Sequence, residues 1–232
     1  MAPRAGANVV ARPHRSWTPL AHAVTATGDQ WTLRIVLALG TETVRLNHLQ
    51  ARLPGISAAT LARQLHHMDS LGLLTRERFR EAPPRVLVTP TQAGIELLPV
   101  AGALARWGMR NLWGAPAADE RVDVGCLLQS LPALIEGAEH LGEGIVETAV
   151  LPDVATPATA AHRGLRRHVF RVRGATVEAA GEPDSAVTAR VEGTQAAWVA
   201  ALGPVADCAG LRFSGDEPLA RRLLDALPRG VG

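Results

Sequence analysis

Four arginines surround a two-proline turn in the segment "LLTRERFREAPPRVLVTP", residues 73–90. Arg76, Arg78 and Arg80 alternate along the chain, so they share one face of a β-strand, and Arg85 follows across the turn. A guanidinium group donates paired hydrogen bonds to phosphate oxygens, which makes this pattern suitable for binding a polyanion. We therefore expect a β-hairpin that contacts the backbone or the minor groove of a nucleic acid.

The segment before this hairpin has the pattern of a helix that could contact bases. Leu61, Leu65, Met68 and Leu71 recur at helical spacing and are expected to face the core. An arginine can bind guanine through two hydrogen bonds, and a glutamine can bind adenine if it points outward. The candidate base-contacting residues are Ser57, Thr60, Arg63, Gln64 and His66.

Ala58, Ala59 and Ala62 occupy other positions at the start of this helix. Alanine can contact the methyl group of thymine, but its side chain forms no hydrogen bond to a base. We therefore expect weak sequence discrimination by the helix and a large contribution from the hairpin. The alternative is that Arg63 and the hairpin arginines are ordinary solvated side chains.

The sequence offers little for metal binding or catalysis. Neighbouring side chains on a helix point about 100° apart, so His66 and His67 cannot bind one ion together. Cys126 and Cys208 are far apart and form no CxxC pair, which argues against a zinc site and a disulfide. HExxH, P-loop, GxSxG and dinucleotide-binding motifs are absent. We expect no metal, no cofactor and no enzyme activity.

Residues 17–113 are expected to form one mostly helical domain that positions the arginines, after a basic arm at residues 1–16. The segment 18–40 predicts two helices broken near Gly28, with Asp29 capping the second one. A short strand and a short helix follow, and Ser57 then caps the candidate base-contacting helix. A long helix runs from position 91 to about 113. Its small and apolar residues form a seam for another helix: Ile95, Leu98, Gly102, Ala105, Met109 and Leu112.

A linker is expected at residues 114–120, and the pattern changes after it. Residues 124–137 predict one apolar helix around Pro132, and four strand-like segments follow. Thr194 and Asp216 are placed to cap two later helices. A sheet followed by helices makes residues 121–232 an α+β domain.

The two halves also differ in charge. Residues 1–115 hold 13 arginines against 6 acidic residues, whereas residues 116–232 hold 11 arginines against 16 acidic residues. A basic half joined to an acidic half predicts two domains with different partners, unless the difference reflects chance on two solvated surfaces. The N-terminus is no secretory signal and no apolar run is long enough to span a membrane, so we expect a cytoplasmic protein.

Residues 17–112 resemble the HxlR-type transcriptional regulators, which are relatives of the MarR group. The resemblance is carried by "WTL" (31–33), "LPGIS" (53–57), "LGLL" (71–74), "PPRV" (83–86), the threonines of "TPT" (89–91) and "RWG" (106–108). It implies a winged helix-turn-helix domain in a homodimer that pairs through the long helix 91–113 and binds double-stranded operator DNA. Thr18 stands where family members often carry a redox-sensing cysteine, so we expect no thiol sensing by that route.

Residues 121–228 resemble the sterol carrier protein type 2-like domain. The residues that carry this resemblance are "AVTARVEGTQAAWVAALG" (186–203), "LRFSGD" (211–216) and "EPLARRLLDALP" (217–228). It implies a small sheet covered by helices around an apolar tunnel that binds a hydrophobic small molecule. The candidate lining residues are Phe170, Val172, Val187, Val191, Trp198 and Leu202, which could equally form an ordinary core.

These observations favour a dimeric transcription regulator that responds to a hydrophobic effector in its C-terminal domain. One alternative is a small-molecule-binding or resistance protein that keeps the winged-helix scaffold for dimerisation. Another is an enzyme that uses the tunnel, with His168 among its polar groups.

Overall fold

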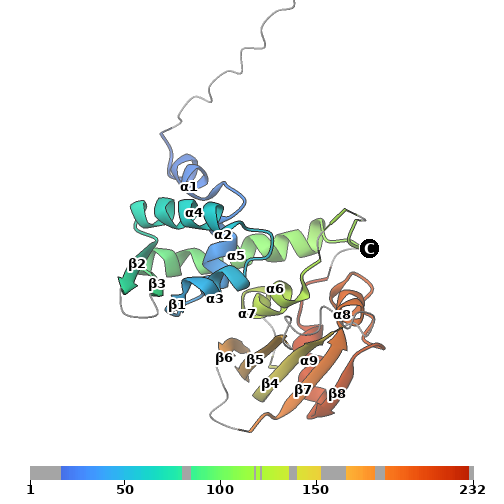
Figure 1. Ribbon diagram of the computed structural model, residues 1–232. Coiled ribbons are helices and arrows are strands. Elements are labelled where there is room, and N and C mark those ends of the chain that lie inside the picture. The colour runs from blue at the N-terminus through green and yellow to red at the C-terminus, as the bar shows by residue number, and fades with distance from the viewer. Residues whose placement is uncertain are drawn as a thin grey trace, which may run out of the picture.

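The computed structural model describes residues 17–79, 85–117, 119–120, 122–135, 140–152, 166–180 and 186–229. Figure 1 shows a mostly helical N-terminal part packed beside a C-terminal sheet that is covered by helices. Each part has its own cluster of buried apolar side chains. The basic arm expected at 1–16 lies outside the described residues.

The described part of residues 17–113 folds into helices around a small antiparallel sheet of strand order β1-β3-β2. The β2–β3 hairpin is in register from Leu74 opposite Pro90 to Phe79 opposite Arg85. In chain order the elements are α1 (Pro19–Thr27), α2 (Thr32–Leu39), β1 (Val44–Arg45), α3 (Leu46–Ala51), α4 (Ala58–Ser70), β2 (Leu74–Phe79), β3 (Arg85–Pro90) and α5 (Gln92–Asn111).

Side-chain caps fix where these helices begin. Oδ1 of Asp29 accepts the backbone N–H groups of Trp31, at 2.7 Å, and Thr32, at 2.9 Å. Asp29 therefore caps the turn that leads into α2, whose own N-cap residue is Trp31 and not Asp29 as predicted. Oγ of Ser57 accepts the N–H of Thr60 at 3.0 Å and caps α4 as expected. The first N–H groups of any α-helix have no backbone partner within the helix. The side-chain oxygens of Asp29 and Ser57 accept hydrogen bonds from some of these groups.

The described part of the C-terminal half contains a mixed five-stranded sheet of order β6-β5-β4-β7-β8. Strands β4 and β7 are parallel, and the other neighbours are antiparallel. The elements are α6 (Val124–Gln129), α7 (Leu131–Leu134), β4 (Gly142–Leu151), β5 (Arg166–Gly174), β6 (Thr176–Ala180), β7 (Ala189–Thr194), α8 (Gln195–Leu202), β8 (Arg212–Gly215) and α9 (Glu217–Asp225). This is the mixed α and β content that the sequence predicts; the likeness to a sterol carrier domain stays a prediction.

The single helix expected around Pro132 is wrong, because two short helices, α6 and α7, meet at Ser130. A proline inside a continuous helix removes one hydrogen bond and clashes with the carbonyl group four residues earlier. Pro132 instead lies in the first turn of α7, where its missing N–H costs nothing.

The long helix α5 has two different faces. The predicted seam is buried at Gly102 and Met109. This face packs against α2 and α7 of the same chain, whereas Leu112, at the end of the seam, is 72% exposed. The opposite face exposes Val100, Leu104 and Trp107, each at about half of its surface. A helix that is apolar on both faces is expected to be covered on both.

Candidate nucleic-acid interface

Helices α3 and α4, joined by residues 52–57, form a helix-turn-helix with the β2–β3 hairpin beside it (Figure 1). The inner face of α4 buries Leu61, Leu65 and Met68 in the N-terminal core. Its outer face exposes the three small residues and the longer side chains that the sequence singles out: Ala58, Ala59, Ala62, Arg63 and His66.

The prediction that Gln64 contacts a base is wrong for this structure, because its side chain points into the domain. Gln64 is only 9% exposed. Its amide nitrogen donates to Oγ1 of Thr32 at 2.7 Å and to Oδ2 of Asp29 at 2.9 Å. The residue therefore attaches α4 to the start of α2.

Asp29, an exposed residue, joins the buried side chains of Gln64 and Thr32 in a polar network, which no local pattern in the sequence predicts. Its carboxylate also accepts a short hydrogen bond from the hydroxyl of Thr32. Burial alone raises the pKa of Asp29, but the hydrogen bonds from Thr32, Trp31 and Gln64 together outweigh burial and lower the pKa below its usual value. A charged carboxylate therefore holds α2 and α4 at a fixed spacing.

Ser57 and Thr60 lie at the start of α4 and contact each other. Oγ of Ser57 donates to Oγ1 of Thr60 at 2.8 Å while it caps the helix. Both hydroxyl groups remain near the surface, since Ser57 is exposed and Thr60 half-buried. Their contact with DNA stays a prediction.

Arg76 fastens the hairpin to α4. Its Nη2 lies 3.0 Å from Oδ2 of Asp69 and 3.2 Å from Nδ1 of His66. Because Asp69 and His66 both belong to α4, these contacts set the angle between strand β2 and the helix. A contact of Arg76 or His66 with phosphate stays a prediction. Such a contact would have to form beside the Arg76–Asp69 and Arg76–His66 contacts or replace them.

The remaining hairpin arginines differ in their surroundings. Arg78 is exposed on β2. Arg85 lies with its guanidinium 4.8 Å from the ring centre of Phe79, the residue opposite it in the hairpin register. Arg80 lies outside the described residues. Phe79 is a further functional candidate that the expectations above did not include, although an aromatic residue paired with an arginine near a hairpin turn is a signal present in the sequence.

The apolar residues expected to line a tunnel in the C-terminal half are mostly packed. Val172, Val191, Trp198 and Leu202 are at most 5% exposed within the core between the sheet and its helices. Nε1 of Trp198 also donates to the carbonyl oxygen of Ala149 at 3.0 Å. These four side chains form a core in this structure, and they do not border the cavity described next.

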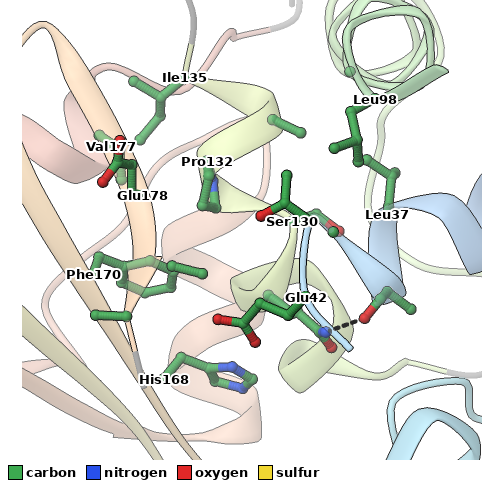
Figure 2. Close-up of a pocket in the computed structure, with 18 of the residues that line it drawn as sticks. Leu37, Glu42, Leu98, Ser130, Pro132, Ile135, His168, Phe170, Val177 and Glu178 are labelled. Carbon is green, nitrogen blue, oxygen red and sulfur yellow. Dashed lines mark hydrogen bonds between the residues drawn. The ribbon is translucent and has the colours of Figure 1, made fainter. Parts of the chain in front are cut away.

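The cavity of about 1300 Å³ lies instead at the junction of the two halves. Of the predicted lining residues Phe170 borders it, whereas Val187 is a half-buried residue before β7 that does not. Figure 2 shows Phe170 and His168 on the side of the sheet, with Leu37 and Leu98 across from them. No local pattern in the sequence predicts the junction, because it depends on how two distant segments pack.

Polar side chains hold the two halves together around this cavity. Nε2 of Gln129 donates across the junction to the carbonyl oxygen of Ala38 at 3.0 Å, and Nη1 of Arg52 donates to the same oxygen at 3.0 Å from within the N-terminal half. Nη1 of Arg106, on α5, donates to the carbonyl oxygen of Ala133 at 2.7 Å. Each of these hydrogen bonds satisfies a carbonyl group near the end of a helix.

Further contacts reach across the junction from both sides. Sγ of Cys126 donates to the carbonyl oxygen of Arg52 at 2.9 Å. Nε1 of Trp113, just after α5, donates to the carbonyl oxygen of Leu202 at 3.1 Å. The winged-helix half is therefore joined to the C-terminal half through α5 and α6.

Among the described residues no cluster of His, Cys, Asp and Glu could hold a metal ion. Within the same residues no helix combines the length and the apolar character that crossing a bilayer requires. The helix-turn-helix and its hairpin therefore remain the described feature with the clearest functional geometry.

The fold of the first half defines a winged helix-turn-helix protein, and comparison with known proteins identifies the family. The model of the HxlR-like helix-turn-helix family matches residues 26–115. An HTH-type transcriptional regulator of Methanothermobacter thermautotrophicus is 34% identical over 86 residues, which make up 37% of this chain and 66% of the relative. The regulatory protein MalR of Fusobacterium mortiferum is 32% identical over 85 residues, covering 36% of this chain and 80% of that protein.

Among solved structures, a MarR-family transcriptional regulator from Porphyromonas gingivalis W83 is 30% identical, with a TM-score of 0.41, and covers 42% of this chain and 95% of that one. The chain belongs to the HxlR-like helix-turn-helix family of transcriptional regulators, with a winged-helix domain in its N-terminal 115 residues. The family model does not extend into the C-terminal half.

Proposed function

We propose that the protein is a dimeric regulator that binds operator DNA through α4 and the β2–β3 hairpin and responds to a small molecule. The observation that carries this proposal is the outer face of α4, where exposed small residues surround Arg63 beside a hairpin that carries arginines. A helix of this kind can enter the major groove while a neighbouring hairpin contacts phosphates or the minor groove.

The small side chains of α4 determine how it would approach DNA. Ala58, Ala59 and Ala62 are exposed and let the helix backbone come close to the floor of the groove. Arg63 can then bind guanine, and the alanine methyl groups can contact thymine. Base discrimination is therefore limited to few positions, and the hairpin supplies affinity.

The hairpin is positioned for this role by Arg76, which joins β2 to α4. Arg78 remains exposed for phosphate contact, and Arg85 is held in place over Phe79. A fixed hairpin does not need to be ordered when DNA binds, which lowers the entropic cost of the contact.

Dimerisation is supported by the outer face of α5 together with α1. Val100, Leu104 and Trp107 on α5 are about half exposed, and Leu20 and Val24 on α1 are more than half exposed. Large apolar side chains left exposed on a helix are typical of a protein interface. We propose that a second copy covers them and presents a second α4 to the next half-site. Leu104→Glu is expected to yield a monomer in sedimentation, whereas Arg110→Glu, an exposed change on the same helix, should leave the dimer intact.

Competition binding across single-base variants of the operator tests the DNA proposal. Arg63→Ala should cost about 1–3 kcal/mol and relax the preference at one position of each half-site. Arg78→Ala should weaken all sequences about equally, because phosphate contacts carry no sequence information. Arg173→Ala removes the same charge from an exposed site on β5 and serves as the control. Unchanged binding by both Arg63→Ala and Arg78→Ala would refute the proposed interface.

A ligand-sequestering protein is the second candidate, and the junction cavity of about 1300 Å³ favours it. In that case the protein would bind its small molecule tightly and show no sequence preference on DNA. The same competition experiment separates the two functions, since only the regulator discriminates between operator variants.

A further inference from the structure

A smaller space adjoins the junction cavity and reaches the helix-turn-helix. This recess, of about 280 Å³, lies between the end of α3, helix α6 and the start of strand β5. Four residues border both the recess and the larger cavity, so the two spaces are neighbours: Arg52, Gln129, Arg167 and His168. A water molecule occupies about 30 Å³ in the liquid, so the recess has room for a compact polar group.

The recess is positively charged. Arg52 and Arg167 border it, and no Asp or Glu among the described residues does. The other residues that border it are Ala51, Gly125, Cys126, Gln129 and His168. The larger cavity differs, because its lining holds three arginines and three glutamates. Two of these glutamates, Glu42 and Glu178, are exposed, so solvent screens their charge.

Contacts within the protein leave both positive charges in place. Nη1 of Arg52 donates to the carbonyl oxygen of Ala38 at 3.0 Å, which uses one of five guanidinium N–H groups and does not change the charge. Nε of Arg167 lies 3.9 Å from Oε1 of Glu147, and the same oxygen lies 2.8 Å from Nε of Arg190. One carboxylate cannot neutralise two guanidinium groups, so this cluster keeps a net positive charge.

The two arginines of the recess come from different halves of the chain. Arg52 ends α3 and begins the turn that leads to α4, whereas Arg167 lies on the C-terminal sheet. Arg52 is half-buried, so solvent screens its charge less than that of a fully exposed side chain. Like charges at one space repel each other. An anion between them would offset this repulsion and link the helix-turn-helix to the sheet.

The cavity beside the recess is suited to an aromatic body. The rings of His168 and Phe170 are stacked, with 6.5 Å between their centres and 13° between their planes. Pro132 and Val177 border the same cavity (Figure 2). Such surfaces favour a ligand that carries a ring system. Because His168 borders both spaces, a ring bound here would lie next to the recess.

We propose that the junction binds an aromatic anion, with its oxyanion group in the recess between Arg52 and Arg167 and its rings against Phe170. Guanidinium groups form charge-assisted hydrogen bonds with carboxylates and similar groups, which makes this pair suited to hold one. Because Arg52 begins the turn before α4, the bound anion would fix the proposed DNA-binding helix relative to the C-terminal half. Only this regulatory step rests on the proposed function.

Two ligands of the same shape and different charge test the site directly. Naphthoate is an anion at neutral pH, and naphthamide is its uncharged counterpart with the same ring system. Calorimetric titration of the full chain should show naphthoate binding at least about tenfold more tightly, because charge-assisted hydrogen bonds are stronger than neutral ones. Equal binding, tighter binding of naphthamide or no binding of either ligand would overturn the proposal.

Variants then locate the anionic group. Arg167→Gln removes a charge that is more than half exposed and should weaken naphthoate binding about threefold. Arg52→Gln, at the half-buried position, should weaken it about tenfold. Neither change should alter the binding of naphthamide. Arg173→Gln removes the same charge from an exposed site on β5 outside both spaces and should leave the affinity unchanged.

Naphthoate binding that survives both Arg52→Gln and Arg167→Gln, or that Arg173→Gln weakens equally, would place the anion elsewhere and contradict the proposal. Arg52→Gln also loses a hydrogen bond to Ala38, so its folding is checked by circular dichroism. Where that variant does not fold, the comparison of Arg167→Gln with Arg173→Gln decides.

The titrations contain no DNA, so their outcome is independent of the proposed regulatory function. Adding naphthoate to the protein–DNA complex should change the operator affinity by about tenfold, within the usual range of allosteric coupling. Naphthoate binding that leaves the DNA affinity unchanged would contradict the regulatory step while it upholds the binding site. Failure of the ligand-free protein to bind DNA would refute the proposed function alone.

Discussion

The proposed DNA-binding surface and the junction between the two halves use arginine in opposite ways. At the junction, Arg52 and Arg106 donate to main-chain carbonyl oxygens of neighbouring helices. On the proposed DNA-binding surface, Arg63 is exposed on α4 and Arg78 on β2. The first pair forms hydrogen bonds within the chain, whereas the second pair is exposed and available to a binding partner.

This difference predicts which substitutions change stability and which change DNA affinity. A side chain that satisfies buried groups contributes to the free energy of unfolding, because its loss leaves those groups without partners. An exposed arginine contributes little to folding but carries charge toward a polyanion. We therefore expect junction variants to change stability and surface variants to change DNA affinity.

The largest effect on stability is expected where α5 and α7 touch. A Cβ atom at Gly102 would lie 2.8 Å from the carbonyl oxygen of Ala133, which is too close for the backbone to accept without moving. Gly102→Val should therefore lower the free energy of unfolding by about 2–3 kcal/mol and disturb the junction. Urea denaturation measures the change.

Gly108 supplies the control on the same helix, since a Cβ atom there meets nothing within 4 Å. Gly108→Ala should stabilise the protein by up to about 1 kcal/mol through helix propensity. Equal effects of the two substitutions would show that the close approach of α5 and α7 is not a constraint.

The next largest effect concerns the polar network between α2 and α4. Gln64→Leu removes the amide that donates to Asp29 and Thr32, and it should cost about 1–3 kcal/mol of unfolding free energy. Gln92→Leu, at an exposed position of α5, is the matched control and should cost little. A Gln64→Leu protein as stable as the wild type would mean that the buried amide is dispensable.

Asp29 should make this stability depend on pH. Because the folded state lowers the pKa of its carboxyl group, the charged form is favoured by folding. The stabilisation is therefore complete above the ordinary aspartate pKa and is lost as the pH falls through the lower folded value. The stability difference between wild type and Asp29→Asn should be constant from neutral pH to about pH 5 and shrink below about pH 4. A difference that grows on acidification would contradict the assigned direction.

The smallest effect on stability is expected in the hairpin. Arg76→Ala removes an ion pair whose side chains are about one third exposed, so it should cost roughly 0.5 kcal/mol. Arg78→Ala, on the same strand, has no described ion pair to lose and should leave the melting temperature unchanged. A larger loss of stability for Arg78→Ala than for Arg76→Ala would contradict the assignment of Arg76 as the residue that holds the hairpin to α4.

Local patterns in the sequence predict the elements of both halves well. Ser57, Thr194 and Asp216 cap the helices that follow them, because a cap depends only on neighbouring residues. The position of Gln64 was also readable: it lies three residues after Leu61 and four before Met68, so it shares their buried face. Its partner, 35 residues earlier, could not be found from local spacing.

The predicted ligand-binding residues show the other limit of prediction from sequence. Val172, Val191 and Trp198 have the alternation and apolarity of a tunnel lining, yet the same pattern describes a filled core. Periodicity identifies which side faces inward and leaves open whether the interior holds side chains or a ligand. The cavity beside Phe170 arises from docking of two halves, for which no local signal exists.

The most direct test of the central claim is the salt dependence of binding to a duplex from the protein's own promoter region, followed by fluorescence anisotropy. The account predicts that the logarithm of the association constant falls linearly with the logarithm of salt concentration, and that Arg78→Ala lowers the slope by about one for each phosphate contact removed. Arg173→Ala should keep the slope of the wild type. No detectable binding at about 50 mM salt, or an affinity that does not change with salt, would contradict the account.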